Sequence, residues 1–366
     1  MSRKPLSLGR MAASLFTLGI FLTLPSLRLH AENSGGDNFV YVMSNINPNN
    51  SVIQFRRASN GSLSLLRDVP TGGSGTGANG ADPLGSQDSL VLGGDGRLLF
   101  AANSGSNEIS VLGVVDGRLT WLSKSTSGGT FPNSIAVSGD LVYVLNSQGD
   151  PNITGFRLDT HGSLHWIATV PLPAGSTGAN DIRFTPTGSR ILVTVSGTNQ
   201  ILLFDVADNG VARNPVPQGS AGGSPFGIRF GHDGVVIVSE AAGSASSYRL
   251  DDDALNVISG AVTNTQNASC WLAVNKSARE AYVSNTGSGT ISTYHIGAKG
   301  DLTLLKAVGA NPGGAPIDSA LSRDGRFLYV DESAQGRVVI FRVDGEGLVP
   351  AGVVSLSAGI QGVAAQ

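Results

Sequence analysis

The sequence predicts an all-β protein, a seven-bladed β-propeller whose ring is closed by a C-terminal strand pairing with the first blade. A unit of four short apolar segments separated by polar turns recurs at intervals in the forties, which is typical of propeller blades. The 50 glycines and the 14% of charged residues suit many short strands joined by tight turns. The two ends of the chain carry complementary parts of one unit.

The repeat is located by the residue that ends the second strand of each unit. These residues are Ser44, Asn103, Asn146, Ser196, Glu240, Asn285 and Glu332. Their spacings are 59, 43, 50, 44, 45 and 47 residues, longer than the periods of leucine-rich, tetratricopeptide or ankyrin repeats. The long first spacing comes from a glycine-rich insert at residues 71–87, which we expect to be a loop leading into blade two, with residues 75–80 as a flexible loop on one rim.

Strands and turns inside a unit follow the same pattern. Residues 327–330 (Phe-Leu-Tyr-Val) are continuously apolar, as expected where neighbouring blades cover both faces of a sheet. Glycine tolerates the positive φ that tight hairpins require. The predicted Gly turns are Asp95-Gly96, Asp233-Gly234 and Asp324-Gly325 between first and second strands, and Asp116-Gly117, Asn209-Gly210 and Lys299-Gly300 between third and fourth strands.

Closure of the ring is predicted from the termini. Residues 38–42 already belong to a second strand, so the first blade lacks its innermost strand. Residues 361–365 follow the seventh blade and match the innermost-strand pattern of residues 133–137. Pairing the tail with the first blade would remove two exposed sheet edges.

The first 31 residues are typical of a secretory signal. Arg3, Lys4 and Arg10 precede an apolar stretch at residues 11–24 that is too short to span a bilayer, and Leu29-His30-Ala31 fits a cleavage site. We therefore expect a signal peptide at 1–31, a linker at 32–37, one propeller domain at 38–366, and a secreted or periplasmic product without a stable membrane span. A retained anchor is the alternative.

Charge and cysteine content exclude several classes of function. Residues 1–31 hold four basic and no acidic residues, so the mature chain has 20 Lys and Arg against 27 Asp and Glu, a net charge of −7. Nucleic acids and anionic membranes need a basic surface, and none is evident. Cys270 is the only cysteine, which rules out an intramolecular disulfide and a Cys/His zinc site.

Two common motifs give no enzyme class. Residues 75–80 match G-x-G-x-x-G, but Asp82-Pro83 and a strand follow where a dinucleotide site needs a helix. No G-x-S-x-G sequence occurs. The four histidines of the propeller, His161, His165, His232 and His295, are expected in turns or outer strands, away from the central channel.

Polar residues at the starts of the innermost strands are the candidate ligand-binding groups. The candidates are Asp88, Asn133, Asp181 and Asp318, with Glu332 at the end of a second strand. Several of these side chains should converge at the channel mouth and could bind a cation or a polyol. Such residues also commonly accept hydrogen bonds from local backbone N–H groups, so a purely structural role is the competing interpretation. Glu240, which also ends a second strand, is the candidate catalytic carboxylate.

Three glycine-proline elements carry a family resemblance. They occur at residues 128–132, 222–225 and 313–316, each before an innermost strand, and second strands similar to Asp-Gly-Arg-Phe-Leu-Tyr-Val follow. From about residue 38 to 366 the chain resembles the seven-bladed lactonase family, which includes propeller-type 6-phosphogluconolactonase and the fungal carboxymuconate lactonizing enzyme. Residues 101–107 are equally similar to YVTN-repeat surface propellers.

The resemblance implies an active site of His and Arg at innermost-strand starts, with a Glu after the second strand of blade five and an Arg in blade six. Glu240 matches that carboxylate. The cationic positions are occupied by Ser134, Asp181, Phe226-Gly227 and Thr286. Lactone chemistry needs cationic groups to hold an anion and to stabilise developing oxyanion charge. We therefore expect no 6-phosphogluconolactonase activity.

The expected function is that of an exported lactonase-like propeller, monomeric, acting as a non-catalytic scaffold for an unidentified small molecule or protein. No cofactor is expected. The alternative is a secreted lactonase or other hydrolase that uses Glu240 and the channel-mouth Asp residues, with a divalent cation held by oxygen ligands as an open option.

Overall fold

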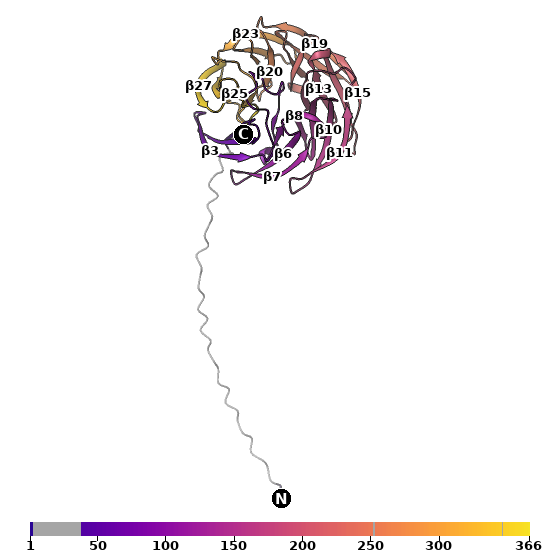
Figure 1. Ribbon diagram of the computed structural model, residues 1–366, viewed down its shortest axis with the longest axis vertical. Coiled ribbons are helices and arrows are strands. Elements are labelled where there is room, and N and C mark those ends of the chain that lie inside the picture. The colour runs from indigo at the N-terminus through magenta and orange to yellow at the C-terminus, as the bar shows by residue number, and fades with distance from the viewer. Residues whose placement is uncertain (3–37, 252, 346) are drawn as a thin grey trace. The chain divides into compact units, whose positions relative to one another are not determined.

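The computed structural model describes residues 1–2, 38–251, 253–345 and 347–366. The expected signal peptide and linker lie outside the described residues, apart from residues 1 and 2. In the part from residue 38 onward, the described strands form seven four-stranded antiparallel sheets arranged in a ring (Figure 1). The prediction of a seven-bladed β-propeller is confirmed. No helix formed by the described residues is long and apolar enough to cross a membrane.

The blades follow chain order, and each runs from an innermost to an outermost strand. Blade one is β28 (Val363–Ala365), β1 (Phe39–Met43), β2 (Ser51–Arg57) and β3 (Leu63–Pro70). Blade two is β4 (Leu90–Gly93), β5 (Leu98–Asn103), β6 (Glu108–Val115) and β7 (Arg118–Thr126). Blade three is β8 (Thr130–Ser138), β9 (Leu141–Gln148), β10 (Asn152–Leu158) and β11 (Leu164–Pro171). Blade four is β12 (Ala179–Phe184), β13 (Arg190–Val195), β14 (Gln200–Val206) and β15 (Ala212–Gly219).

The remaining blades have the same order of strands, from innermost to outermost. Blade five is β16 (Pro225–Phe230), β17 (Val236–Glu240), β18 (Ser244–Asp251) and β19 (Ala254–Thr263). Blade six is β20 (Ser269–Val274), β21 (Glu280–Asn285), β22 (Thr290–Ile296) and β23 (Leu302–Ala310). Blade seven is β24 (Ser319–Leu321), β25 (Phe327–Glu332), β26 (Arg337–Asp344) and β27 (Gly347–Ser355). Three short 3₁₀ turns are η1 (Gly94–Gly96), η2 (Ser196–Thr198) and η3 (His232–Gly234).

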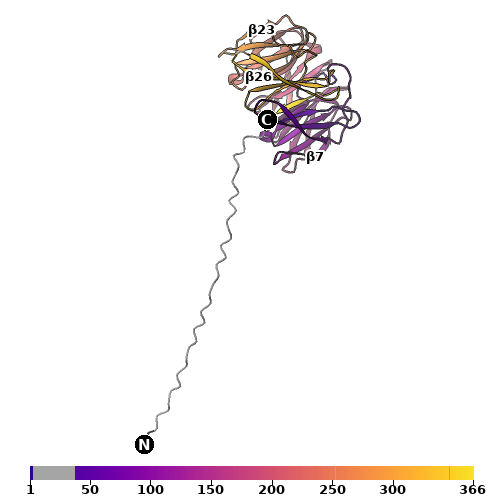
Figure 2. The same ribbon diagram turned by 90° about the vertical axis from the view of Figure 1, so that its left-hand side faces the viewer.

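The tail closes the ring as predicted. Strand β28 pairs antiparallel with β1, and Val363 lies opposite Val42. The Tyr41 hydroxyl donates to Oε1 of Gln366 at 3.2 Å, which fixes the last residue. In the view of Figure 2 the outer strands β7 and β23 lie on opposite sides of the ring. Because β28 pairs with β1, the inner edge of β1 is not left exposed.

The core consists of apolar layers between adjacent blades. Phe100 of blade two and Val142 of blade three belong to one such layer, and both are fully buried. Tyr329 of blade seven packs with Val40 of blade one in another, across the point of closure. Because each sheet is covered on both faces, its central strands are apolar at nearly every position, which explains the continuous apolar runs in the sequence.

The predicted turns agree with the backbone conformation. Asp116 (φ 49°) and Gly117 (φ 69°) are both left-handed in the two-residue hairpin between β6 and β7, as a type I′ turn requires.

The residue expected to end the second strand was wrong in three blades. β1 ends at Met43 and β13 at Val195, one residue before Ser44 and Ser196, and β9 continues to Gln148, beyond Asn146. The glycine-rich insert leads into blade two as predicted, and its last residues, Ser86 and Gln87, are fully buried against the innermost strands.

Candidate functional site

Residues 82–87, called here the mouth segment, lie where the innermost strands begin. The Gln87 side chain binds both backbone groups of Leu272, donating to the carbonyl at 2.7 Å and accepting from the N–H at 3.0 Å. The indole N–H of Trp271 donates to the carbonyl of Ser86 at 2.8 Å. These three hydrogen bonds attach the segment to blade six.

Other hydrogen bonds attach the mouth segment to blades three, four and one. The Ser86 hydroxyl donates to the carbonyl of Asn133 at 2.6 Å. Nδ2 of Asn180 donates to a carbonyl of the segment at 2.7 Å. Nε2 of Gln361, just before the closing strand, donates to the Asp82 carboxylate at 2.8 Å. A segment held by blades on several sides of the axis closes the channel at this end.

Apolar side chains pack beside the mouth segment. Phe226, Cys270, Trp271 and Ile317 form one buried cluster, in which the rings of Phe226 and Trp271 lie 4.8 Å apart. Burial raises the pKa of the Cys270 thiol far above its ordinary value. Burial also raises the pKa of Asp82 to about 6, against the hydrogen bonds that it accepts. The predicted channel mouth is therefore filled, with this apolar cluster packed beside the hydrogen-bonded groups of the mouth segment.

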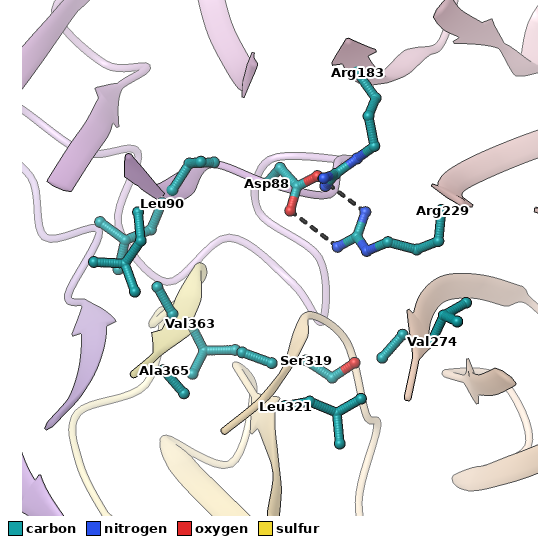
Figure 3. A pocket seen from close by; sticks show the side chains of 14 residues that line it. Asp88, Leu90, Arg183, Arg229, Val274, Ser319, Leu321, Val363 and Ala365 are labelled. Carbon is teal, nitrogen blue, oxygen red and sulfur yellow. Dashed lines mark hydrogen bonds and ion pairs between the residues drawn. The ribbon is translucent and has the colours of Figure 1, made fainter. Parts of the chain in front are cut away.

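A cluster of charged side chains lies directly beyond the mouth segment. Asp88 accepts two hydrogen bonds from the guanidinium of Arg229, both at 3.0 Å, in a bidentate pair. Arg183 forms a second ion pair with the same carboxylate through Nη2. Figure 3 shows the side chains of Arg183 and Arg229 both pointing toward the Asp88 carboxylate. The negative charge of Asp88 thus compensates part of the positive charge of both guanidinium groups. Without it, burying these charged groups would be unfavourable.

Asp181 is the second carboxyl group of this cluster and is fully buried. Its Oδ2 accepts a hydrogen bond from the backbone N–H of Ile228 at 2.7 Å and lies 3.6 Å from Nη1 of Arg229. Burial raises the pKa of Asp181 to about 7, and the positive charge of Arg229 limits the rise. Its carboxyl group therefore changes charge near neutral pH.

Asp318 and Asp331 complete the cluster from blade seven. Burial raises the pKa of Asp318 to about 7, opposed by Arg229 and by the N–H of Ser319. Burial and the nearby Asp318 raise the pKa of Asp331 well above its ordinary value. Neither carboxyl oxygen of Asp331 has a hydrogen bond of normal geometry among the described residues, so its neutral form is favoured.

A cavity of about 220 Å³ adjoins Asp88, Arg183 and Arg229 (Figure 3). Its wall is made largely of small or apolar residues from the innermost strands of blades one, two, six and seven, several of which directly follow Asp88 or Asp318 in the chain. They are Leu90, Val91, Leu92, Ala273, Val274, Ser319, Ala320, Leu321, Val363, Ala364 and Ala365. The cavity therefore extends away from the mouth segment, toward the opposite end of the channel.

The structure brings three of the five predicted ligand-binding residues together, because Asp88, Asp181 and Asp318 surround the two arginines. Asn133 lies instead at a hollow beside the mouth segment, where its Nδ2 donates to the carbonyl of Ala179 at 2.9 Å. Glu332 is fully buried and paired with Arg337. Asn133 and Glu332 therefore lie apart from the group formed by the three acids.

Glu240, the candidate catalytic carboxylate, lies in a hydrogen-bonded shell of its own blade. Its side chain is fully buried, and Oε1 accepts from the N–H of Gly222 at 2.8 Å. The hydroxyls of Ser220, Ser244 and Ser246 also donate to the carboxylate. This geometry ties the end of β17 to the turn before β16 and to β18. The carboxylate of Glu240 thus serves a structural role, as an acceptor of hydrogen bonds from its own blade.

Glu240 and the Asn residues at equivalent positions share this role. Asn103 accepts from Asn50 and Thr71, and Asn285 donates to Thr290 and Ser292. The polar residue that ends a second strand therefore organises the adjoining turns in several blades.

Two features were missed from the sequence. Arg183 and Arg229 each stand in the tripeptide Ile-Arg-Phe of an innermost strand, at 182–184 and 228–230. A cation repeated inside an otherwise apolar strand of two successive blades was the signal that could have revealed them. The mouth segment had no comparable signal, because its contacts come from residues distant in sequence.

The acids in this cluster do not form a metal centre. Among the described residues, no three His, Cys, Asp or Glu side chains are arranged to hold a metal ion. Asp88 is already engaged by two guanidinium groups, and Asp181 lies near one of them. A cation placed among the acids would face both arginines, which disfavours it electrostatically. The donor set does not fit a divalent cation.

Comparison with known proteins agrees with the fold described above. The family model described as "Lactonase, 7-bladed beta-propeller" matches residues 29–177 and 238–364. No curated protein sequence matches the chain.

Solved structures match the fold over nearly its whole length. The periplasmic gluconolactonase of Pseudomonas aeruginosa has a TM-score of 0.70 at 17% identity, with 89% of this chain and 98% of that chain covered. A Lactobacillus plantarum protein has a TM-score of 0.74 at 18% identity, with 90% and 99% covered. A functionally unknown protein from Desulfotomaculum acetoxidans has a TM-score of 0.69 at 16% identity, with 89% and 98% covered. At these identities the likeness concerns the fold alone.

Proposed function

The chain belongs to the family of seven-bladed β-propeller lactonases, and from this premise we propose that it is an exported, non-catalytic binding protein. The observation that carries the proposal is the closed channel mouth. The mouth segment and the cluster of Phe226, Cys270, Trp271 and Ile317 occupy the end of the channel where the resemblance places lactone chemistry. A substrate would have to displace buried apolar surface and several hydrogen bonds to reach that position.

The residues at the implied cationic positions support the proposal. Ser134 donates to Asp181 at 3.3 Å, and Thr286 donates to the carbonyl of Pro316 at 2.7 Å. Phe226 packs on Trp271. None of these side chains carries a positive charge, and the two hydroxyls already donate within the fold, so none offers the free donor or cation that stabilises a lactone oxyanion in hydrolases.

The hydrogen bonds of Glu240 support it as well. A general base needs a free acceptor within reach of the proton that it removes. The carboxylate of Glu240 already accepts from a backbone N–H and three serine hydroxyls, and its side chain is fully buried. Its geometry suits a stabilising role in blade five.

One observation favours the alternative, a secreted lactonase or other hydrolase. Asp181 and Asp318 have pKa values raised to about 7, close to two arginines, and acids with such pKa values are common at catalytic sites. In that case the acids would act from the cavity, beyond the mouth segment. The two functions make opposite predictions for turnover.

A hydrolysis assay separates them. The mature chain would be incubated with a panel of five- and six-membered lactones, with and without EDTA, beside Glu240→Gln and Asp181→Asn. A binding protein gives only the spontaneous rate in every sample. Saturable turnover that is lost in Asp181→Asn would establish the hydrolase, and turnover lost in Glu240→Gln would place the chemistry at the predicted carboxylate. EDTA sensitivity would add a cation to the mechanism.

Export and oligomeric state are tested separately. We propose that residues 1–31 direct the chain out of the cytoplasm and are removed, leaving a monomer. Fractionation of cells, followed by N-terminal sequencing of the mature protein, should find a start near Glu32. Light scattering should give the mass of one chain. A full-length product in the cytoplasmic fraction would contradict the export proposal.

A further inference from the structure

The channel is a blind cavity with a charged floor. Its closed end is the mouth segment, and its floor is formed by Asp88, Arg183 and Arg229. The wall beyond the floor comes from small side chains such as Ala273, Ala320 and Ala364. These small residues leave space along the axis, and the charged side chains of the floor line one end of it.

Arg183 has N–H groups that are not engaged by Asp88. Arg229 directs both Nη1 and Nη2 to Asp88, and Nη1 also donates to the carbonyl of Ile228 at 2.8 Å. Arg183 contacts Asp88 through Nη2, its side chain is 28% exposed, and it lines the cavity. A guanidinium group has five N–H donors, so those of Arg183 that do not face Asp88 can donate to an acceptor in the cavity.

We propose that this cavity binds a small organic monocarboxylate, with Arg183 as the principal donor to the carboxylate. The proposal deepens the binding role given above and rests on it only in treating the channel as a binding site. Arginine offers the planar fork that matches two carboxylate oxygens. The apolar wall suits a short carbon chain, and Ser319 on the wall is the one hydroxyl-bearing side chain there.

The volume limits the size of the ligand. A cavity of about 220 Å³ has room for a ligand with a few carbon atoms. Acetate, propanoate and lactate fall within that limit. A sugar phosphate is larger and doubly charged, and its second charge would find Arg229 already paired with Asp88.

Protonation of the surrounding acids favours an anion. The groups that face the floor are Asp88 before β4, Asp181 and Arg183 on β12, Arg229 on β16, Asp318 before β24 and Asp331 on β25. With pKa values raised to about 7, Asp181 and Asp318 lose their negative charge as the pH falls below neutrality. Monocarboxylate binding should therefore tighten from about pH 8 to about pH 6.

Isothermal titration calorimetry of the mature chain with acetate, propanoate and lactate tests the proposal, with lactamide as the uncharged counterpart of lactate. At least one carboxylate should bind with a stoichiometry of one, and lactamide should not. Arg183→Gln should weaken binding by roughly tenfold to a hundredfold, the loss of a charge-assisted hydrogen-bonded pair. Asp88 keeps its bidentate partner Arg229 in this variant, so the fold should persist.

The matched control is Arg157→Gln, because Arg157 also pairs with an aspartate but lies on the outer surface. It should bind like the wild type. Ala320→Leu provides a second variant, which fills the cavity without changing its charges and should abolish binding.

The proposal is overturned if none of the three carboxylates binds, if lactamide binds as well as lactate, or if Arg157→Gln weakens binding as much as Arg183→Gln. These results concern the cavity alone. The lactone assay decides catalysis independently, so failure of one proposal is distinguishable from failure of the other.

Discussion

Trp271 donates its indole N–H to the backbone carbonyl of Ser86 at 2.8 Å, joining residues separated by 185 positions in the chain. This contact links the start of the innermost strand of blade six to a segment that precedes blade two. The Gln87 side chain reinforces the link through two hydrogen bonds to Leu272. These contacts hold the mouth segment across one end of the channel.

Removing the Gln87 side chain should loosen the mouth segment. Gln87→Ala loses both hydrogen bonds to blade six, so the segment should open more often. Cys270 lies beside the segment, is 7% exposed and is the only thiol in the chain. Its rate of modification by a thiol reagent under native conditions should therefore rise several-fold, on the scale that about 1 kcal/mol of lost contact allows.

The control for this prediction is Gln54→Ala. Gln54 is also fully buried and also makes two hydrogen bonds to backbone groups, those of Gly117 and Leu119, but it lies in β2. Equal labelling rates in the two variants would show that general loss of stability, and not the mouth segment, governs access to Cys270.

Asp318→Asn should change how stability depends on pH. Burial raises the pKa of Asp318 in the folded protein to about 7, above the value of about 4 in an unfolded chain. Folding therefore takes up a proton between these values. The corresponding stability is fully present below about pH 4 and is lost as the pH rises through about 7.

The variant lacks this ionisation, and the amide oxygen can still accept from Ser319. In thermal unfolding, the melting temperature of Asp318→Asn should increase relative to that of the wild type as the pH rises from about 5 to about 8. The corresponding change in the free energy of unfolding is on the order of a few kcal/mol at most. Asp208→Asn, at an exposed position, serves as control. A pH profile parallel to that of the wild type would exclude the assigned ionisation.

Glu240→Ala should destabilise the fold. The substitution leaves the N–H of Gly222 and the hydroxyls of Ser244 and Ser246 without their acceptor in a buried environment. Chemical denaturation should show a loss of about 2–4 kcal/mol. Glu108→Ala removes a carboxylate that is partly exposed and pairs with Lys124, and should cost about 1 kcal/mol or less. A stable Glu240→Ala protein would contradict the structural role given to this residue.

Deleting residues 361–366 should disrupt the ring. The deletion removes β28, its pairing with β1, and the contacts of Gln361 with the mouth segment. The edge of β1 would be exposed, so the truncated chain should unfold at lower temperature and aggregate more readily. The substitution Gln366→Ala keeps β28 and loses only side-chain bonds to Tyr41 and Gly96. A truncated protein as stable as Gln366→Ala would mean that closure contributes little.

The predictable part of the structure depends on local patterns. The turn at Asp116-Gly117 and the apolar run at 327–330 follow from residues that are adjacent in sequence, and counting the repeats located the closing strand. The end of β13 was misplaced by one residue, because Ser196 resembles the polar residues that end other second strands but starts a 3₁₀ turn.

The site was harder to predict because its properties arise from distant contacts. Asp88 and Asp181 could be named from their places at innermost strands, yet their ion pairs with Arg183 and Arg229 depend on how blades two, four and five meet. The mouth segment reads as a glycine-rich loop, and only its contacts with Trp271 and Leu272 reveal its position.

The most direct measurement of the central claim is the initial rate of lactone hydrolysis by the mature wild-type chain, beside a catalytically active lactonase of the same fold. The claim is that the closed mouth leaves a binding protein without lactonase chemistry. We predict a rate equal to spontaneous hydrolysis at every lactone concentration, while the active enzyme saturates. A saturable rate above background, proportional to the concentration of this protein and lost on denaturation, would contradict the claim.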